Sequence, residues 1–339
     1  MTMRWLRRIP KIELHIHLDG SLRLGTFLDL AKGLPADRRF PSSLNLRRAV
    51  TPKSRGSLEE YLESFRYTIA VLQSAKSLER AAFELCEDAA KENVAYLEIR
   101  FGPLLHTAYG LSPRDVVQAA AAGCTHAKEA FGIEAGLLLT ALRNESTERS
   151  MEVAQLAAQF RGKGVVGFDL AGPERGFPPT MHRAAVELAH DARVPVTLHA
   201  GEGCCPEHIK EALDLGAARI GHGVYLFKLP AIEKRVAKEG IPLEICPTSN
   251  LQVSGFMNSY ADHPLKRYLD LGIPVTLNTD NRLMSQIDLT HEYAAIVNAF
   301  SLERDDVERI VLAGVEAAFT SDAVKRGLRA KVEAAFAAD

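Results

Sequence analysis

Several features that mark particular protein classes are missing from this sequence. Its five cysteines are odd in number and include no Cys-x-x-Cys pair, so neither a disulfide framework nor a thiolate zinc site is expected. No apolar run approaches the ~18 residues that a membrane-spanning helix needs. The first residues lead into a polar strand, without the apolar stretch of a signal peptide. We therefore expect a cytoplasmic protein in a reducing compartment, with no membrane partner.

An excess of charge of one sign is also absent. Lys and Arg number 41, and Asp and Glu number 43, which gives a formal net charge of -2. The chain as a whole lacks the positive field with which nucleic-acid binders attract phosphates. Its 339 residues are 47% hydrophobic and 25% charged, as in a globular protein with a large core. These figures favour a small-molecule partner over a nucleic acid.

Signature motifs of several enzyme classes are not found either. The sequence has no glycine-rich dinucleotide motif after a strand, no Walker lysine loop, no Gly-x-Ser-x-Gly elbow and no His-Glu-x-x-His helix. The Pro-Cys-x-x-Cys motif of cytidine-type deaminases is also missing. Dinucleotide-dependent enzymes, serine hydrolases of the elbow type and zincin proteases are therefore disfavoured.

Short apolar runs alternate with longer helical patterns along the whole chain. We count eight such runs, at residues 12–18, 94–101, 133–139, 165–170, 194–198, 219–221, 243–246 and 275–279. Strands separated by helices pair in parallel through right-handed crossovers. The pattern predicts an α/β fold, a (β/α)8 TIM barrel in which residues 1–339 form one domain.

The connection between the first two predicted strands, at about residues 22–90, is longer than one helix requires. Extra helices are therefore expected to cap the barrel mouth, and a lid is one interpretation. Ser57-Leu-Glu-Glu60 has the capping-box pattern, and Tyr61, Phe65 and Ile69 follow at helical spacing. This pattern predicts one amphipathic helix. Spacing alone also allows Tyr61 and Phe65 to be ordinary core residues.

The first predicted strand carries polar side chains on one face. Because side chains alternate along a strand, His15, His17 and Asp19 point the same way. A pair of hydrogen-bonded core histidines is the plain alternative. Two adjacent imidazoles in a barrel interior both need partners, however, and a divalent metal satisfies both at once.

Other polar residues occur at the ends of later predicted strands. His199 and Glu202, His222, and Asp280 each follow a different strand, and the carboxyl ends of barrel strands meet at one mouth. Imidazole and carboxylate ligands suit zinc, although cobalt, nickel and iron accept the same ligands. We predict a zinc site with Glu202 and His222 free for proton transfer and with four ligands, His15, His17, His199 and Asp280.

At this level of detail the chain resembles the adenosine deaminase family of the amidohydrolase superfamily. The matching segments occur in order over almost the whole chain: His15-Ile-His17-Leu-Asp19-Gly-Ser, Tyr96-Leu-Glu98-Ile-Arg100-Phe-Gly-Pro103, Asp169-Leu-Ala-Gly172-Pro-Glu, His199-Ala-Gly-Glu202, Gly221-His222-Gly, Cys246-Pro-Thr-Ser249-Asn and Asn278-Thr-Asp280. The first segment alone is shared by many metal-dependent hydrolases, whereas the whole set is specific.

The resemblance implies a catalytic role for the matching residues. Glu202 would protonate a purine ring nitrogen, and His222 would orient and deprotonate the attacking water with help from Asp280. One zinc ion per subunit is implied, because the fourth strand lacks the lysine that two-metal relatives use. A two-metal hydrolase of cyclic amides or esters and a non-catalytic binding protein are therefore weaker interpretations.

The resemblance also implies a set of substrate contacts. Gly172 would give a backbone donor to the purine, and Asp19 would bind a ribose hydroxyl. Many family members have a second aspartate where this chain has Asn281, and an amide can donate to a purine nitrogen without first being protonated. The predicted substrate-binding residues are His17, Asp19, Tyr61, Phe65, Gly172 and Asn281.

The predicted activity is zinc-dependent hydrolysis of adenosine and 2′-deoxyadenosine to inosine and 2′-deoxyinosine with release of ammonia, a step of purine salvage. Deamination of another 6-aminopurine, adenine or aminodeoxyfutalosine, is the alternative. The expected partner is a small purine nucleoside, and the sequence does not indicate an oligomeric state.

Overall fold

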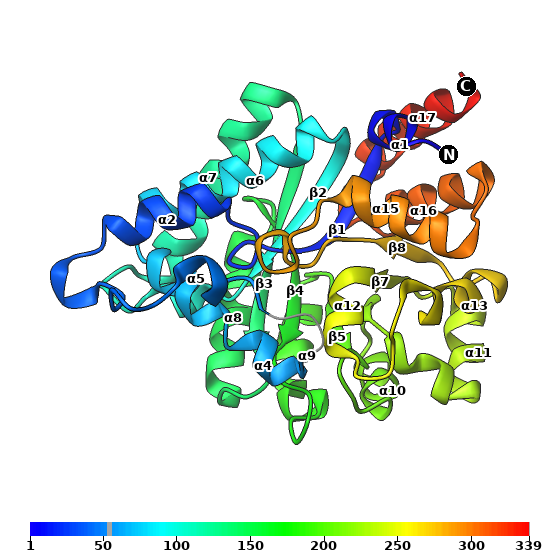
Figure 1. Cartoon of the computed structure of the whole chain (residues 1–339). Helices are drawn as coiled ribbons and strands as arrows, with labels where there is room; N and C mark the ends of the chain where they lie inside the picture. The colour runs from blue at the N-terminus through cyan, green and yellow to red at the C-terminus, as the bar shows by residue number, and fades with distance from the viewer. Residues whose placement is uncertain (53–55, 339) are drawn as a thin grey trace.

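The computed structural model describes residues 1–52 and 56–338. Within these residues, eight parallel strands stand at the centre of the molecule (Figure 1). They form two four-stranded sheets, each in chain order. The strands are β1 (Lys11–His17), β2 (Val94–Phe101), β3 (Glu134–Leu142), β4 (Val165–Ala171), β5 (Thr197–Ala200), β6 (Arg219–His222), β7 (Leu243–Ile245) and β8 (Val275–Leu277). All eight predicted strands are confirmed.

Isolated parallel bridges join the two sheets at both seams. Ile16 of β1 pairs with Asp280 just after β8, and Phe168 of β4 pairs with Val196 just before β5. At the first seam, the N–H of His17 donates to the carbonyl of Asp280 at 2.7 Å. The strands therefore follow one another around a ring, as the predicted (β/α)8 fold requires.

Helices surround this ring and connect successive strands (Figure 1). Among the described residues, no helix is both long and apolar enough to cross a membrane. The α-helices are α1 (Met3–Arg8), α2 (Leu24–Lys32), α3 (Leu46–Ala49), α4 (Leu58–Leu62), α5 (Phe65–Val71), α6 (Ala75–Lys91), α7 (Pro113–Phe131), α8 (Thr147–Phe160), α9 (Arg183–Asp191), α10 (Glu207–Asp214), α11 (Pro230–Glu239), α12 (Pro247–Val253), α13 (Leu265–Asp270), α14 (Arg282–Ser285), α15 (Leu289–Phe300), α16 (Arg304–Ala317) and α17 (Asp322–Ala337).

Local sequence explains where the long helices begin and end. Ser74 and Ser112 cap α6 and α7 through reciprocal capping boxes, and Pro113 occupies the first turn of α7, where no N–H partner is needed. Gly132 ends α7 with a φ of 71°, a left-handed conformation that glycine adopts without a Cβ clash. These local signals define where the two helices begin and where α7 ends.

The predicted apolar and polar faces of β1 face different parts of the structure. A Cβ on Gly314 of α16 would lie 2.9 Å from Ile12, so the apolar face of β1 lies against this helix at close range. The opposite face of the strand carries His15 and His17 and points into the ring.

The segment predicted to form one helix after Ser57 consists of two short helices, so this prediction is wrong in part. Ser57 does cap α4, accepting a hydrogen bond from the N–H of Glu60. The ladder ends where the N–H of Ser64 turns back to the carbonyl of Tyr61, a bond over three residues instead of four. Helix α5 then starts at Phe65, and both helices pack against a small apolar cluster next to the site.

Candidate metal centre and active site

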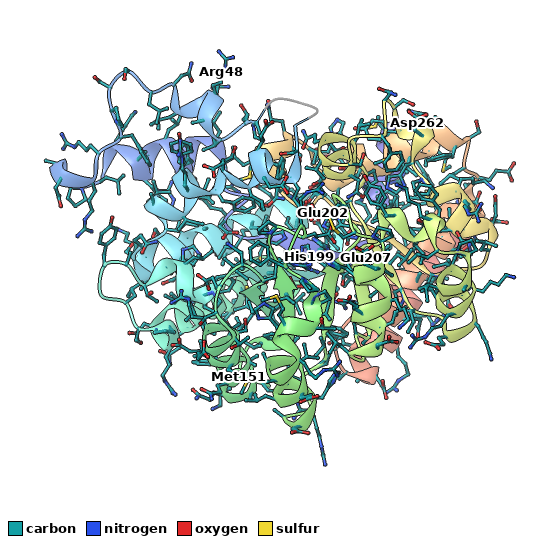
Figure 2. All side chains as sticks on the ribbon, turned by 90° about the horizontal axis from the view of Figure 1, so that it is seen from below. Arg48, Met151, His199, Glu202, Glu207 and Asp262 are labelled. Carbon is teal, nitrogen blue, oxygen red and sulfur yellow. A yellow bond between two sulfur atoms is a disulfide. The ribbon has the colours of Figure 1, made fainter. Side chains whose placement is uncertain are left out.

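The first strand brings two imidazoles to the centre of the ring. The ring centroids of His15 and His17 lie 5.5 Å apart, and that of His15 lies 4.6 Å from that of His199 on β5. Figure 2 shows His199 near the centre of the molecule, whereas Arg48 and Asp262 lie towards its edge. Two histidines of the first strand and one from a distant strand therefore meet inside the strand ring.

Asp280, just after β8, completes a group of four ligand atoms. Its Oδ1 lies 3.5 Å from Nε2 of His15 and 3.3 Å from Nε2 of His17. Nε2 of His17 and Nε2 of His199 are also 3.3 Å apart. The other carboxylate oxygen, Oδ2, accepts a hydrogen bond from the Ser249 hydroxyl at 2.5 Å. This bond leaves Oδ1 free to face the rings of His15 and His17.

Three separations among these atoms match those around a tetrahedral divalent ion. Bonds of about 2.0–2.1 Å from zinc to nitrogen place neighbouring ligand atoms about 3.3 Å apart, close to the separations observed here. Nε2 of His15 is buried without a hydrogen-bond partner among the described residues. Burial lowers the pKa of His17 and of His199, so both rings are neutral at pH 7 and present lone pairs. The predicted ligand set is thus brought together.

Two buried carboxylates hold the far nitrogens of these rings. Asp169 on β4 lies 3.0 Å from Nδ1 of His199, and Glu244 on β7 lies 2.9 Å from Nδ1 of His15. Arg100 on β2 donates to Glu244 at 2.7 Å and to Asp169 at 3.4 Å, which links the two carboxylates. Such partners fix the orientation of imidazole ligands.

Sequence reasoning assigned no role to Asp169, Glu244 or Arg100. Burial alone would raise the pKa of Glu244, but Arg100 and Arg219 hold it well below its ordinary value. A signal was present, because these are charged residues in otherwise apolar, buried strands.

Glu202 and His222 lie side by side next to the ligand group. Nε2 of His222 is 3.6 Å from Oε1 of Glu202, and both side chains are buried. Burial raises the pKa of Glu202 well above its ordinary value, and the charges of Asp280 and Glu174 raise it further. Burial likewise lowers the pKa of His222 well below its ordinary value. Burial in this site therefore favours the protonated form of the Glu202 carboxyl and the neutral form of the His222 imidazole.

Tertiary contacts orient the His222 ring. Its Nδ1 lies 2.9 Å from the side-chain amide nitrogen of Asn250, which leaves Nε2 as the nitrogen that faces the site. His222 and Asp280 both have positive φ values, of 63° and 60°. Such backbone conformations are rare for residues with a Cβ and cluster at functional sites.

Two adjoining cavities lie between the ligand group and helices α4 and α5. The smaller one, of about 30 Å³, lies among His17, His199, Glu202, Asp280 and their neighbours Tyr61 and Asn281. The larger one, of about 380 Å³, extends outward past Asp19 and Leu62. Phe65 and Gly172 line both cavities. All the predicted substrate-binding residues therefore line this mouth.

Two of these residues have buried polar atoms without partners among the described residues, Oδ1 of Asp19 and Oδ1 of Asn281. Burial raises the pKa of Asp19 to about 7. A Cβ on Gly20 would lie 1.7 Å from Oδ1 of Asn281, so only glycine at this position admits the amide. The hydroxyl of Tyr61 is 3.1 Å from that of Ser285.

The cysteine prediction is wrong at one place. Cys204 and Cys205 form a disulfide, and the other three cysteines are free and buried. The prediction rested on the odd number of cysteines and on the missing Cys-x-x-Cys spacing, so it did not consider a bond between two adjacent residues. It lies directly after Glu202, and Cys205 has a positive φ of 54°.

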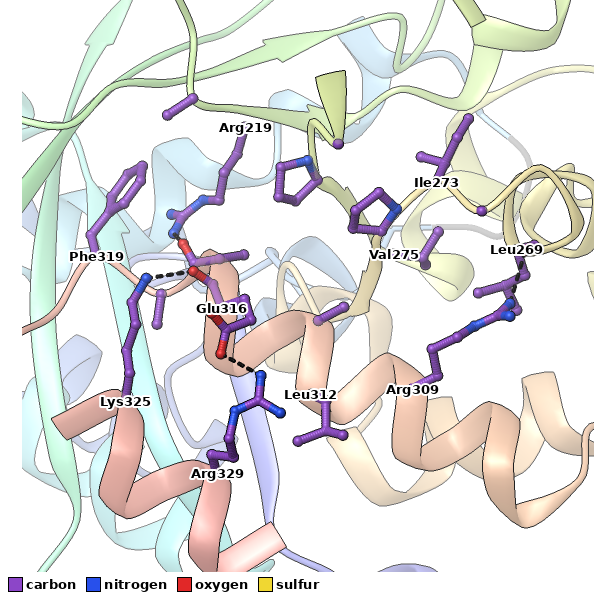
Figure 3. A pocket seen from close by; sticks show the side chains of 18 residues that line it. Arg219, Leu269, Ile273, Val275, Arg309, Leu312, Glu316, Phe319, Lys325 and Arg329 are labelled. Atoms are coloured by element: carbon purple, nitrogen blue, oxygen red, sulfur yellow. Dashed lines mark hydrogen bonds and ion pairs between the residues drawn. The ribbon is translucent and has the colours of Figure 1, made fainter. Parts of the chain in front are cut away.

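A third, larger cavity lies at the opposite end of the strands (Figure 3). It has about 610 Å³, and its charged side chains have protein partners. Arg329 donates to Glu316 at 2.7 Å, Lys325 donates to the backbone carbonyl of Glu316, and Arg309 donates to the carbonyl of Leu269 at 2.8 Å. This cavity therefore offers no free catalytic group.

Comparison with known proteins agrees with the geometry. The family profile described as adenosine deaminase matches residues 10–335. An adenosine deaminase of Clostridium perfringens is 41% identical over 331 residues, covering 96% of this chain and 99% of its own.

Solved structures show the same fold. The N6-methyl-AMP deaminase of Arabidopsis thaliana is 32% identical with a TM-score of 0.89 over 100% of both chains. An amidohydrolase of Burkholderia ambifaria with bound zinc is 25% identical with a TM-score of 0.88, covering 99% of this chain and 95% of its own. The chain belongs to the adenosine deaminase family.

Proposed function

We propose that this protein removes the 6-amino group of adenosine and 2′-deoxyadenosine by hydrolysis, giving inosine or 2′-deoxyinosine and ammonia. The observation that carries the proposal is the buried Glu202 carboxyl, whose pKa burial raises, 3.6 Å from His222 and beside the four candidate ligand residues. Hydrolysis at a purine carbon needs a proton for the adjacent ring nitrogen and an activated water for the carbon itself.

Each residue contributes one step. His15, His17, His199 and Asp280 would hold a zinc ion, which when bound would lower the pKa of water towards ~7. Glu202 donates its proton to the ring nitrogen, which makes the amino-bearing carbon electrophilic. His222 orients the attacking water through Nε2 and, with Asp280, takes up the proton that this water loses. The C–N bond then breaks as the proton held by His222 passes to the amino group, which leaves as ammonia, and the hydroxyl left on the same carbon returns a proton to Glu202 as it becomes the carbonyl of the product.

The larger cavity supports a nucleoside over free adenine. Beyond the residues that surround the reacting ring, about 380 Å³ of space is lined by Asp19, Leu62 and Phe65. The unpartnered Oδ1 of Asp19 is an acceptor for a sugar hydroxyl, and the apolar side chains of α4 and α5 suit the sugar face. Closure of this helical segment over the sugar stays a prediction.

Charge at the outer rim supports a nucleoside over a nucleotide. Glu59 and Glu63 line the larger cavity with Arg66. Arg66 is exposed, donates to the hydroxyl of Tyr67 at 2.5 Å and lies 3.6 Å from Glu63. Two carboxylates and one engaged arginine disfavour a phosphate dianion. A substrate with a 5′-phosphate, such as the N6-methyl-AMP in the name of the Arabidopsis relative, is therefore disfavoured here.

A substrate panel tests the proposal. Adenosine, 2′-deoxyadenosine, adenine, AMP and aminodeoxyfutalosine are compared by the loss of adenine absorbance with the zinc-loaded protein. We expect the highest kcat/KM for adenosine and 2′-deoxyadenosine. A preference for AMP or adenine would overturn the assigned substrate, and no turnover of any 6-aminopurine would overturn the activity.

Two finer expectations belong to the same proposal. We infer one zinc ion per chain, to be measured as metal content after purification. The cytoplasmic location and the role in purine salvage stay predictions, which localisation of the tagged protein and growth on adenosine as the purine source would test.

A further inference from the structure

One buried carboxylate outside the reacting group accepts hydrogen bonds from the backbone of an entire loop. Glu174 lies three residues after β4 and is 1% exposed. It accepts hydrogen bonds from the four consecutive backbone N–H groups of residues 201–204, which we call the acid loop because it contains Glu202. The distances are 2.6 Å from Gly201, 3.1 Å from Glu202, 2.9 Å from Gly203 and 3.0 Å from Cys204.

This arrangement stabilises a buried charge through the loop that it holds. A buried carboxylate is costly unless donors compensate it, and charge-assisted bonds from backbone N–H groups are strong compensation. The loop has little freedom of its own, because Gly201 has a φ of 64° and a Cβ there would lie 2.5 Å from Ile209. The acid loop therefore takes its path from one side chain of a different strand connection.

Glu174 does not reach the reacting group itself. It lines neither of the two cavities at the mouth. Its neighbour on the other side is His208, whose Nδ1 lies 3.9 Å from Oε1. Its influence on the chemistry therefore reaches the Glu202 side chain, which faces His222 at 3.6 Å, both through the path of the acid loop and through its charge, which raises the pKa of Glu202.

We propose that Glu174 is the positioning residue for Glu202, because the four N–H bonds of the acid loop set where the Glu202 carboxyl lies. The inference rests on the proposed role of Glu202 as proton donor. A small displacement of a proton donor lowers the rate of its step with little effect on substrate binding.

The test is Glu174→Gln in the zinc-loaded protein. Glutamine keeps the shape but replaces one acceptor oxygen with an NH2 group that faces the loop N–H groups. We expect kcat to fall about 10- to 100-fold, with KM within about twofold and the zinc content unchanged. Glu174→Asp keeps the charge with a shorter reach, so its kcat should lie between those of the wild type and Glu174→Gln. Glu233→Gln, which changes a buried glutamate paired with Arg267 on the outer helices, is the matched control.

A double-mutant cycle separates positioning from a general structural role. If Glu174 acts only through Glu202, the variant carrying both Glu174→Gln and Glu202→Gln should have the kcat of Glu202→Gln alone. Wild-type kcat in Glu174→Gln, or losses that multiply in the double variant, would overturn the inference. If Glu174→Gln does not fold, the same cycle is run with Glu174→Asp. Full activity of Glu202→Gln would instead overturn the proposed function, so the two failures are distinguishable.

Discussion

The two ends of the strand ring differ in how completely their buried polar groups are hydrogen-bonded. At the end that holds the cavities, the buried atoms that have no hydrogen-bond partner within residues 1–52 and 56–338 include Nε2 of His15, Nε2 of His222, Oδ1 of Asp19 and Oδ1 of Asn281. An unsatisfied buried polar atom costs about 1–3 kcal/mol. This end therefore carries a cost that a metal ion and a substrate would relieve.

At the opposite end, the buried charge is paired on every side. Arg219 donates to Glu98 at 2.5 Å, to Glu244 at 2.6 Å and to the carbonyl of Ala317 at 2.7 Å. Its guanidinium also stacks 3.5 Å above the ring centre of Phe319 (Figure 3). The contrast teaches that the groups proposed for chemistry lie at one end of the strands and the stabilising charge pairs at the other, with Glu244, which also holds Nδ1 of His15, joining the two. Changes at one end should then affect catalysis, and changes at the other should affect folding.

Removal of the metal should have the largest effect, because it leaves the ligand group at the mouth uncompensated. Exhaustive chelation is expected to abolish activity and to lower Tm, since a ligand present at a thousand times its Kd stabilises the folded state by about 4 kcal/mol. Activity and Tm are measured before and after chelation and again after zinc is added back. Full activity in the chelated protein would contradict the assigned site.

Glu202→Gln should separate catalysis from stability at the mouth. Without the proton donor, kcat should fall by about 100-fold or more, whereas zinc content and Tm stay near their wild-type values. Glu207→Gln is the control, because Glu207 is an exposed glutamate in the following helix. Loss of zinc in Glu202→Gln would show that this residue is a ligand.

Phe319→Ala tests the opposite end. Removal of the ring that covers Arg219 should destabilise the fold by about 3 kcal/mol, measured by denaturant unfolding, while kcat at a temperature where the variant is folded stays unchanged. A large loss of kcat in the folded variant would show that this end of the strands also affects catalysis.

Asn281→Asp should give the smallest effect. An aspartate must be protonated before it can donate to a purine nitrogen, so the variant loses one hydrogen bond as pH rises through its pKa. A bond worth about 1 kcal/mol corresponds to roughly a fivefold increase in KM. We expect KM of the variant to rise with pH relative to the wild type, with zinc content unchanged, as measured over a pH series. A loss of zinc would mean that Asn281 supports the metal and not the substrate.

Local patterns were sufficient for most of the fold and for the ligand set. Alternation in β1 placed His15 and His17 on one face, and the end of β5 placed His199 at the same mouth. The helix after Ser57 was predicted less well, because a bond from Ser64 back to Tyr61 breaks it. Periodicity gives which residues share a face, but it does not give where a helical ladder stops.

Contacts between distant segments were beyond such patterns. Glu174, which holds the acid loop, and Arg100, which links Asp169 to Glu244, act on groups supplied by other strand connections. Nothing in the local sequence around a glutamate or an arginine indicates which distant residue it will contact in the folded protein.

By itself, the sequence determined the alternation of strands and helices, the polar face of the first strand and the types of ligand available, because these depend on residue chemistry and spacing along the chain. Only the tertiary structure decided that burial raises the pKa of Glu202, that a disulfide follows it and that one carboxylate holds its loop. Burial and hydrogen bonding depend on which distant segments pack together, and this is settled only when the ring of strands closes.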